Sequence, residues 1–265
     1  MSDIDPAIRD HYVSRNERDR LTAGAGLVEF LRTQELLGRV LPSVPAVVLD
    51  VGGGAGIHAA PLAQQGYEVH LIDAVPLHVE QAREIPDLAS ASTGDARELA
   101  WPDDSVDAVL LLGPLYHLTE RADRVRALAE ARRVLRTGGV VAAAAISRYA
   151  STLGGLFRGQ LRHPGFEAIV ERDLIDGQHR NPDDVPEWFT TAYFHEPREL
   201  MDEASDAGLV DTSVLAVEGP AAMLPDVDRW LADDRDLLMR AIRRVEAAPA
   251  LLGVSPHVLL CAYAA

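Results

Sequence analysis

The sequence predicts an α/β protein built around a doubly wound, mostly parallel β-sheet. Two observations support this prediction. Between residues 46 and 146, short apolar runs rich in β-branched residues alternate with helical segments at short spacing, which is typical of consecutive strand–helix–strand units. The first run, in the stretch VLDVGGGAG from Val48 to Gly56, leads directly into a glycine-rich turn. A buried strand followed by such a turn and a helix is typical of a site for a nucleotide-like ligand.

Length and composition limit the class of protein. A chain of 265 residues suits one α/β domain with an elaboration, and we expect a helical cap over residues 1–45 and the main domain over residues 46–265. The net charge of −16 makes nucleic acid or an anionic membrane surface a poor partner. The single cysteine, Cys261, excludes an intramolecular disulfide and a multi-cysteine metal site. The N-terminus has no apolar signal core, and no apolar run approaches about 20 residues, which predicts a cytoplasmic protein without a membrane partner.

The N-terminal segment is expected to be mostly helical. A polar stretch from Tyr12 to Arg20 precedes apolar residues that recur at broadly helical spacing. Pro42 and Pro45 end that helix ahead of the first strand. Most of the apolar residues are expected to pack against the sheet. The polar stretch carries more polar side chains than a packing helix needs.

Five strands with helices between them are expected in the first half of the main domain. The strands are predicted over residues 47–51, 68–72, 89–92, 106–112 and 140–146, and the helices over residues 57–65, 75–83 and 121–135. Pro61 should bend the first of these helices, and Gly138-Gly139 is expected to close the last.

The second half of the chain departs from this alternation. Residues 147–195 form a long, turn-rich stretch with two possible helices, as expected of a lid or substrate insertion. A helix over 197–207 and a strand over 209–217 follow. Residues 220–255 read as a helical insertion, with one charged amphipathic helix over 226–247, before a last strand over 257–263.

The glycine turn excludes two common kinds of nucleotide site. Gly52, Gly53, Gly54 and Gly56 allow positive φ angles and a close approach of a ligand to the backbone. Their spacing does not satisfy the G-x-G-x-x-G pattern of dinucleotide sites, and the chain contains no G-x-x-x-x-G-K-[ST] phosphate loop. The turn therefore indicates a ligand that needs a side-chain-free surface more than a pyrophosphate site.

Two carboxylates follow neighbouring strands of the predicted sheet. Asp73 ends the second strand about 20 residues beyond the glycines, where it can accept hydrogen bonds from a ribose diol. Asp95 follows the third strand in the sequence Thr93-Gly94-Asp95-Ala96. Each aspartate could instead cap a turn or helix, but both are placed at the edge of the sheet where ligands bind in such folds.

The order of these features resembles that of the class I S-adenosylmethionine-dependent methyltransferases of small molecules. The resemblance covers roughly residues 46–146. It is carried by five pieces in order: VLDVGGGAG, Asp73, Gly94-Asp95-Ala96, DSVDAVLLLGPLYHL and RRVLRTGG. It implies a Rossmann-like, mostly parallel sheet of seven strands with helices on both faces, an antiparallel last strand and a helical lid.

The resemblance also implies S-adenosylmethionine as the cofactor and S-adenosylhomocysteine as its product. The glycine turn would line the methionine portion, Asp73 would hold the ribose, and Asp95 would accept from the adenine amino group. Carbonyl groups after the fourth strand would receive the ammonium, and the polar N-terminal stretch would close over the cofactor. The implied cofactor-binding residues are Tyr12, Arg20, Asp50, Gly52, Gly53, Gly54, Asp73, Ala74, Asp95, Ala96, Leu112 and Gly113.

Candidate residues for the acceptor side are less sharply defined. His117 and Tyr116 follow the fourth strand, and His117 could act as a base near neutral pH or be a histidine satisfied within the packing. Four side chains in the expected lid could contact an acceptor, although ordinary packing or hydrogen bonding accounts for them as well: His179, Arg180, Trp188 and Tyr193. No histidine spacing suggests a metal.

The sequence therefore predicts methyl transfer to an oxygen or nitrogen atom of a small-molecule acceptor by in-line displacement, in a monomer or homodimer that does not bind nucleic acid. Such a reaction requires the protein mainly to align the acceptor and exclude water. The alternative is a non-catalytic or regulatory protein that keeps the cofactor fold. A nicotinamide-dependent oxidoreductase is a weaker alternative because of the glycine spacing.

Overall fold

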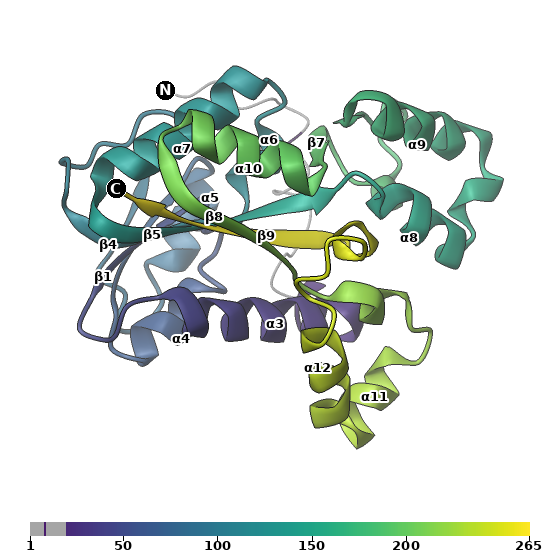
Figure 1. Ribbon diagram of the computed structural model, residues 1–265, viewed down its shortest axis with the longest axis horizontal. Coiled ribbons are helices and arrows are strands. Elements are labelled where there is room, and N and C mark those ends of the chain that lie inside the picture. The colour runs from purple at the N-terminus through teal and green to yellow at the C-terminus, as the bar shows by residue number, and fades with distance from the viewer. Residues whose placement is uncertain (1–7, 9–19) are drawn as a thin grey trace.

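The computed structural model describes Ile8 and residues 20–265, and within them a nine-stranded sheet forms the centre of the molecule (Figure 1). The strands in the order β3-β2-β1-β4-β5 are parallel, and β9 pairs antiparallel with both β5 and β8. Two short strands, β7 and β6, extend the far end of β5. The bounds are β1 (Val47–Val51), β2 (Glu68–Asp73), β3 (Ser90–Thr93), β4 (Val106–Leu111), β5 (Leu135–Ser147), β6 (Gln178–His179), β7 (Ala192–His195), β8 (Leu209–Ala216) and β9 (His257–Ala264).

Helices cover both faces of the sheet. On one face, α7 and α10 pack against an apolar cluster that includes Leu49, Leu128 and Leu200. On the other, α3 and α4 pack against a second cluster that includes Leu36 and Leu62. The helices are α3 (Gly24–Val40), α4 (Ala59–Gln64), α5 (Pro76–Ala82), α6 (Pro114–His117), α7 (Arg121–Val134), α8 (Ala150–Arg158), α9 (Pro164–Asp176), α10 (Pro197–Asp206), α11 (Val227–Asp233) and α12 (Arg235–Arg243). None of the helices in the described ranges is long and apolar enough to span a membrane.

This architecture confirms the predicted α/β class, the mostly parallel sheet, the flanking helices and the antiparallel last strand. The sheet differs from the expected seven strands because residues 147–195 add β6 and β7. These strands are only two and four residues long, so their sequence carries too few residues to show an alternation.

Two helix boundaries also differ from the expectation. Gly138-Gly139 does not close a helix: α7 ends at Val134, and the glycines lie within β5 beside a shift of register opposite Val106. The charged stretch over 226–247 is two helices, because the backbone leaves the helical region at Asp234 (φ −138°, ψ 35°).

The two insertions lie on different sides of the sheet. Helices α8 and α9 project beyond the end of β5 and pack around Phe166 and Trp188. Helices α11 and α12 pack against α3 around Val28 and Ile242. Helix α3, which contacts the cavity described below, is thus supported by a segment about 200 residues later in the chain.

Candidate active site

The described residues enclose a cavity of about 330 Å³ at the carboxyl ends of the parallel strands. This is the edge where open α/β sheets bind their ligands. The segments that follow β1, β2, β3 and β4 all contribute to its wall, together with Ile8 and α3. The cavity brings together most of the residues selected from the sequence: Arg20, Asp50, Gly52, Gly53, Gly54, Asp73, Ala74, Asp95, Ala96, Leu112, Gly113, Tyr116 and His117. Tyr12 lies outside the described residues.

The glycine turn follows β1 and needs glycine for two physical reasons. Gly52, Gly54 and Gly56 have φ angles of +69°, +56° and +83°, which lie in the region that residues with a side chain rarely adopt. A Cβ at Gly52 would also lie 2.5 Å from Cγ of Pro114. The turn therefore presents bare backbone to the cavity, and α6 closes over it.

Asp73 connects the end of β2 to this turn. One carboxylate oxygen accepts a hydrogen bond from the backbone N–H of Gly54 at 2.8 Å, and the other accepts from the N–H of Val75 at 2.8 Å. His78 Nδ1 lies 3.2 Å from the same side chain. Asp73 thus fixes the turn, and its carboxylate lines the cavity with lone pairs remaining for a hydroxyl donor.

Asp50 is a buried acid in the cavity wall whose pKa is strongly shifted. It is buried, and within the described part of the chain neither carboxylate oxygen has a hydrogen-bond partner. Burial, with a smaller contribution from the charge of Asp73, raises the pKa of Asp50 to about 7. A buried carboxylate without a partner is costly, and a cationic ligand group would relieve that cost.

Asp95 has a different environment. Both oxygens of its carboxylate accept from the Arg97 guanidinium, at 2.7–3.2 Å, and Oδ1 also accepts from the Arg97 backbone N–H at 2.9 Å. Burial would raise the pKa of Asp95, but the hydrogen bonds and charge of Arg97 outweigh it and lower that pKa. Asp95 is therefore held as an anion in a fixed orientation at the end of β3, next to Ala96.

Tyr116 and His117 lie on α6, directly above the end of β4. The Tyr116 hydroxyl donates to the carbonyl oxygen of Leu112 at 3.3 Å. His117 Nδ1 lies 3.3 Å from the carbonyl oxygen of Thr191, and its ring stacks on Phe189 at 5.9 Å between centroids. The segment before β7 thus touches the candidate base, so the 147–195 region reaches the cavity through α6.

Sequence reasoning missed several polar residues of the cavity wall. Glu29 on α3 accepts both guanidinium bonds of Arg20, at 2.5 and 2.9 Å. His58 follows the glycine turn, and its Nδ1 lies 3.0 Å from Nε2 of Gln34. Burial lowers the pKa of His58 to about 4, so it is neutral at physiological pH. The position of His58 immediately after the turn was the available signal, because the start of that helix faces the ligand site.

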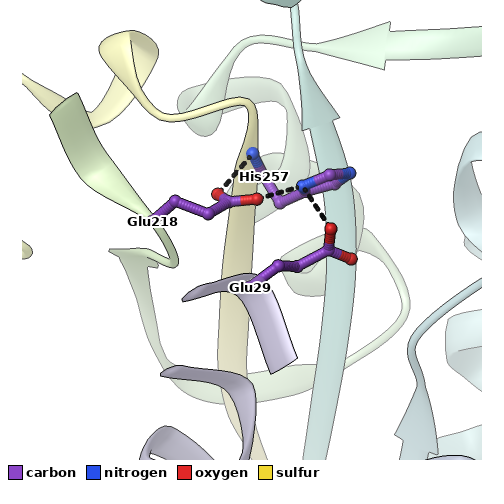
Figure 2. A group of neighbouring side chains, drawn as sticks. All are labelled: Glu29, Glu218 and His257. Atoms are coloured by element: carbon purple, nitrogen blue, oxygen red, sulfur yellow. Dashed lines mark hydrogen bonds and ion pairs between the residues drawn. The ribbon is translucent and has the colours of Figure 1, made fainter. Parts of the chain in front are cut away.

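One group near the cavity has the side chains of a metal site. Potential ligand atoms of Glu29, Glu218 and His257 all lie within 4.8 Å of one another (Figure 2). However, Glu29 already holds the guanidinium of Arg20, and the surrounding carboxylates raise the pKa of His257 to about 9 despite its burial. Because a metal requires the neutral imidazole, the arrangement is that of an ion-pair cluster.

The four candidate acceptor residues of the lid do not line the cavity: His179, Arg180, Trp188 and Tyr193. His179 is buried between the Asp173 carboxylate at 2.9 Å and the Trp188 carbonyl oxygen at 2.7 Å. Trp188 packs on Phe166, and Arg180 donates to backbone carbonyl groups. Tyr193 lies beneath the Arg124 guanidinium, 3.6 Å from its ring centre. The contacts of His179, Arg180 and Trp188 thus organise the insertion itself, and the contact of Tyr193 joins β7 to α7.

Proteins and a family model of similar sequence are named as methyltransferases. Residues 48–139 match the sequence model of a family described as a methyltransferase domain. An uncharacterized methyltransferase of Mycobacterium tuberculosis is 35% identical over 105 residues, which cover 40% of this chain and 42% of that protein. A ubiquinone biosynthesis O-methyltransferase of Cereibacter sphaeroides is 29% identical over 210 residues, covering 76% of this chain and 73% of that protein. The match to the mycobacterial protein spans about two fifths of its length.

Solved structures show the same fold. The crystal structure of an S-adenosylmethionine-dependent methyltransferase from Thermotoga maritima, described as a possible histamine N-methyltransferase, superposes with a TM-score of 0.62 at 20% identity. The superposition covers 97% of this chain and 99% of that one.

The parallel sheet, the side-chain-free turn and the acidic groups at the ends of β2 and β3 define a Rossmann-like domain with a cavity at the carboxyl edge of its sheet. Residues 48–139 match the methyltransferase domain family, and the fold of the chain is that of solved S-adenosylmethionine-dependent methyltransferases.

Proposed function

We propose that this protein transfers the methyl group of S-adenosylmethionine to an oxygen or nitrogen atom of a small-molecule acceptor. The observation that carries the proposal is the buried carboxylate of Asp50 beside the bare glycine turn and Asp73, for which the described residues offer no hydrogen-bond partner. A ligand that carries both a cationic amino group and a ribose satisfies these two acids together. Such a ligand needs no pyrophosphate site, in agreement with the glycine spacing.

The residues of the cavity fit the parts of this cofactor. Asp50 and the carbonyl groups of Leu112 and Gly113 would receive the ammonium group, and Asp73 would receive the ribose hydroxyls. Gly52, Gly53, Gly54 and Ala74 would lie against the cofactor without steric conflict. Asp95 and the Ala96 N–H would recognise the adenine edge, with the Asp95 carboxylate held in place by Arg97.

When bound, the cofactor supplies an electrophilic methyl group, so the chain's own residues need mainly to orient the acceptor and keep water out. His117 lines the cavity and also contacts the Thr191 carbonyl oxygen and Phe189, so it lies between the cavity and the insertion. His117 would take a proton from a hydroxyl or ammonium acceptor, and Tyr116 would help to orient it.

The acidic chain and its relatives support a small-molecule acceptor. The net charge of −16 disfavours nucleic acid, and a relative's name specifies ubiquinone biosynthesis O-methylation. Monomer or homodimer and a cytoplasmic location are part of the proposal. A non-catalytic protein that retains the cofactor is the second candidate, because it would use the same contacts to the cofactor.

The test is a screen for release of S-adenosylhomocysteine with panels of phenolic, carboxylic and amine acceptors. The proposal predicts turnover with one of these classes and a large loss of turnover in the His117→Ala variant. Binding of S-adenosylhomocysteine together with no turnover across all panels would favour the non-catalytic reading.

A further inference from the structure

Phe189 has a backbone conformation that is rare for a residue with a side chain. It lies between the 3₁₀ turn Pro186–Trp188 and β7, with φ 66° and ψ 179°. This region is essentially restricted to glycine, because a Cβ collides there with the neighbouring backbone. The other described residues with a side chain and a positive φ are all aspartates, which tolerate that sign of φ better. A bulky residue keeps such a conformation only where its surroundings hold it, and this occurs preferentially at functional sites.

The Asn181 side chain holds the peptide group that follows Phe189. Its amide nitrogen donates to the carbonyl oxygen of Phe189 and to that of Val185, each at 2.8 Å. Its own oxygen accepts from the Val185 N–H at 3.1 Å. Asn181 therefore ties the two ends of this short loop together, and its amide can turn only by giving up several hydrogen bonds.

His179 holds the peptide group that precedes Phe189. Its Nε2 donates to the carbonyl oxygen of Trp188 at 2.7 Å, since a carbonyl oxygen can only accept. Its Nδ1 lies 2.9 Å from the Asp173 carboxylate, and both side chains are 1% exposed. A buried ring held at both nitrogens cannot rotate without losing a hydrogen bond. The carbonyl groups of Trp188 and Phe189 are thus fixed by two different side chains.

The segment held in this way packs against His117. The Phe189 ring stacks on the imidazole, with 5.9 Å between the ring centroids and 27° between the planes, and it meets the Tyr116 ring at 6.3 Å. The carbonyl oxygen of Thr191, in the same segment, lies 3.3 Å from His117 Nδ1. Because a carbonyl oxygen only accepts, Nδ1 is the donor, and the lone pair of the neutral ring is on Nε2.

We propose that Asn181 and His179 are positioning residues for His117. They hold Phe189 in its glycine-like conformation, so that the Phe189 ring and the Thr191 carbonyl together fix the imidazole as the Nδ1–H tautomer. Nε2 is then the basic nitrogen of a side chain that lines the cavity. The use of Nε2 as a base rests on the proposed function, whereas the tautomer is a property of the protein alone.

The tautomer can be measured by NMR of the ring nitrogens in protein that contains isotope-labelled histidine, at a pH high enough for neutral imidazole rings. The chain has nine histidines, and the signals lost in His117→Ala assign those of His117. We expect the Nδ1–H form in the wild-type protein. In Asn181→Ala, the Nε2–H form should become the major one, as it is for histidine in water.

The matched control is Gln160→Ala. The Gln160 amide also donates to a backbone carbonyl of this segment, that of Glu187 at 3.4 Å, but it does not hold the peptide groups on either side of Phe189. Its removal should leave the tautomer of His117 unchanged. A second variant, Phe189→Leu, keeps the backbone hydrogen bonds and removes the aromatic ring, and it should shift the tautomer in the same direction as Asn181→Ala.

A wild-type His117 ring mainly in the Nε2–H form would overturn the proposal. An unchanged tautomer in Asn181→Ala or Phe189→Leu, with the fold intact by circular dichroism, would overturn it as well. If one variant does not fold, the wild-type spectrum and the other variant decide.

Turnover provides a second measurement once an acceptor has been identified. Asn181→Ala should lower kcat about tenfold and leave the KM for S-adenosylmethionine unchanged, because the base is misplaced while the cofactor contacts remain. A raised KM with an unchanged kcat would contradict the proposal. If no acceptor were methylated but the tautomer of His117 behaved as expected, the proposed function would fail while the positioning of His117 would stand.

Discussion

The Asp50 carboxylate fills the space that a side chain at Gly53 would need: a Cβ there would lie 2.6 Å from Oδ2 of Asp50 and 2.8 Å from Cδ1 of Leu71. The acid under the turn and the bare backbone above it are therefore a single steric unit. A change in the Asp50 side chain would therefore move the backbone at Gly53, and a change at Gly53 would move Asp50.

This relationship predicts the effect of Gly53→Ala. The added methyl group would displace Asp50 and the turn, so we expect cofactor affinity to fall at least tenfold, because a shifted turn loses several contacts at once. Calorimetric titration with S-adenosylhomocysteine measures this loss. Gly38→Ala on α3 is the control: a Cβ at Gly38 meets no atom within 4 Å, and this variant should keep its affinity and gain up to about 1 kcal/mol of stability.

The raised pKa of Asp50 predicts an unusual dependence of stability on pH. The folded pKa of about 7 lies above the ordinary value of 3.8, so between these values the folded protein binds more protons than the unfolded one. The contribution of Asp50 to stability is therefore complete below the lower value and is lost as the pH rises through the higher one. As the pH rises from about 4 to about 7, Asp50→Asn should gain stability relative to the wild type, measured by urea unfolding. A pH-independent difference would contradict the assignment.

The same group predicts proton release on ligand binding. A cationic amino group beside Asp50 would lower its pKa, so near pH 6.5 the wild-type protein should release a fraction of a proton when S-adenosylhomocysteine binds. Calorimetry in two buffers of different ionisation enthalpy measures this quantity. Asp50→Asn should show no such release, and equal release in both proteins would assign the proton to another group.

Replacement of Asp73 should weaken cofactor binding more than its loss of charge alone suggests. Asp73→Ala removes the acceptor for the ribose and also the anchor of the Gly54 and Val75 N–H groups. We expect a loss on the order of 1.5–3 kcal/mol in cofactor binding. The exposed acid Glu80 on α5 provides the control, since Glu80→Ala should leave the affinity unchanged.

Substitution of His117, the proposed base, should affect turnover but not cofactor affinity. His117→Ala should lower turnover at saturating cofactor by on the order of 10²-fold, with cofactor affinity nearly unchanged. Steady-state kinetics with an identified acceptor gives both quantities. His163→Ala, an exposed histidine at the start of α9, should retain full turnover. Unchanged turnover in His117→Ala would return this residue to a packing role.

A buried ion pair behind the site should dominate local stability. The Arg124 guanidinium binds Glu203 at 2.7–3.1 Å, and both side chains are at most 2% exposed. Glu203→Ala would leave the Arg124 charge uncompensated and should cost about 3–5 kcal/mol of unfolding free energy. Asp206→Ala on the same helix breaks an exposed pair with Arg121 and should cost less than about 1 kcal/mol. Similar losses for the two variants would contradict this account.

The part of the cavity around the glycine turn could be predicted because its signals are local. Residues 47–56 carry a buried strand and a turn within ten residues, and Asp73 ends a strand that is itself recognisable. Asp50 lies directly before the turn in the sequence, but the absence of a hydrogen-bond partner for it among the described residues depends on what surrounds it in three dimensions.

The polar residues on the α3 side of the cavity could not be predicted in the same way. Glu29 lies within an amphipathic helix, where an acid looks like any surface residue, and its ionic partner His257 comes 228 positions later in the chain. His179 and Trp188 of the insertion stand out in the sequence as polar and aromatic residues. In the structure, the His179 ring lies 2.7 Å from the carbonyl oxygen of Trp188, so the two residues contact each other. Long-range pairing of this kind leaves no periodic pattern.

The most direct test of the central claim is a calorimetric titration of the wild-type protein with S-adenosylhomocysteine and, separately, with NAD. The account predicts micromolar binding of S-adenosylhomocysteine and no binding of NAD, because the turn lacks the dinucleotide spacing and the cavity offers Asp50 to an amino group. Micromolar binding of NAD with none of S-adenosylhomocysteine would contradict it.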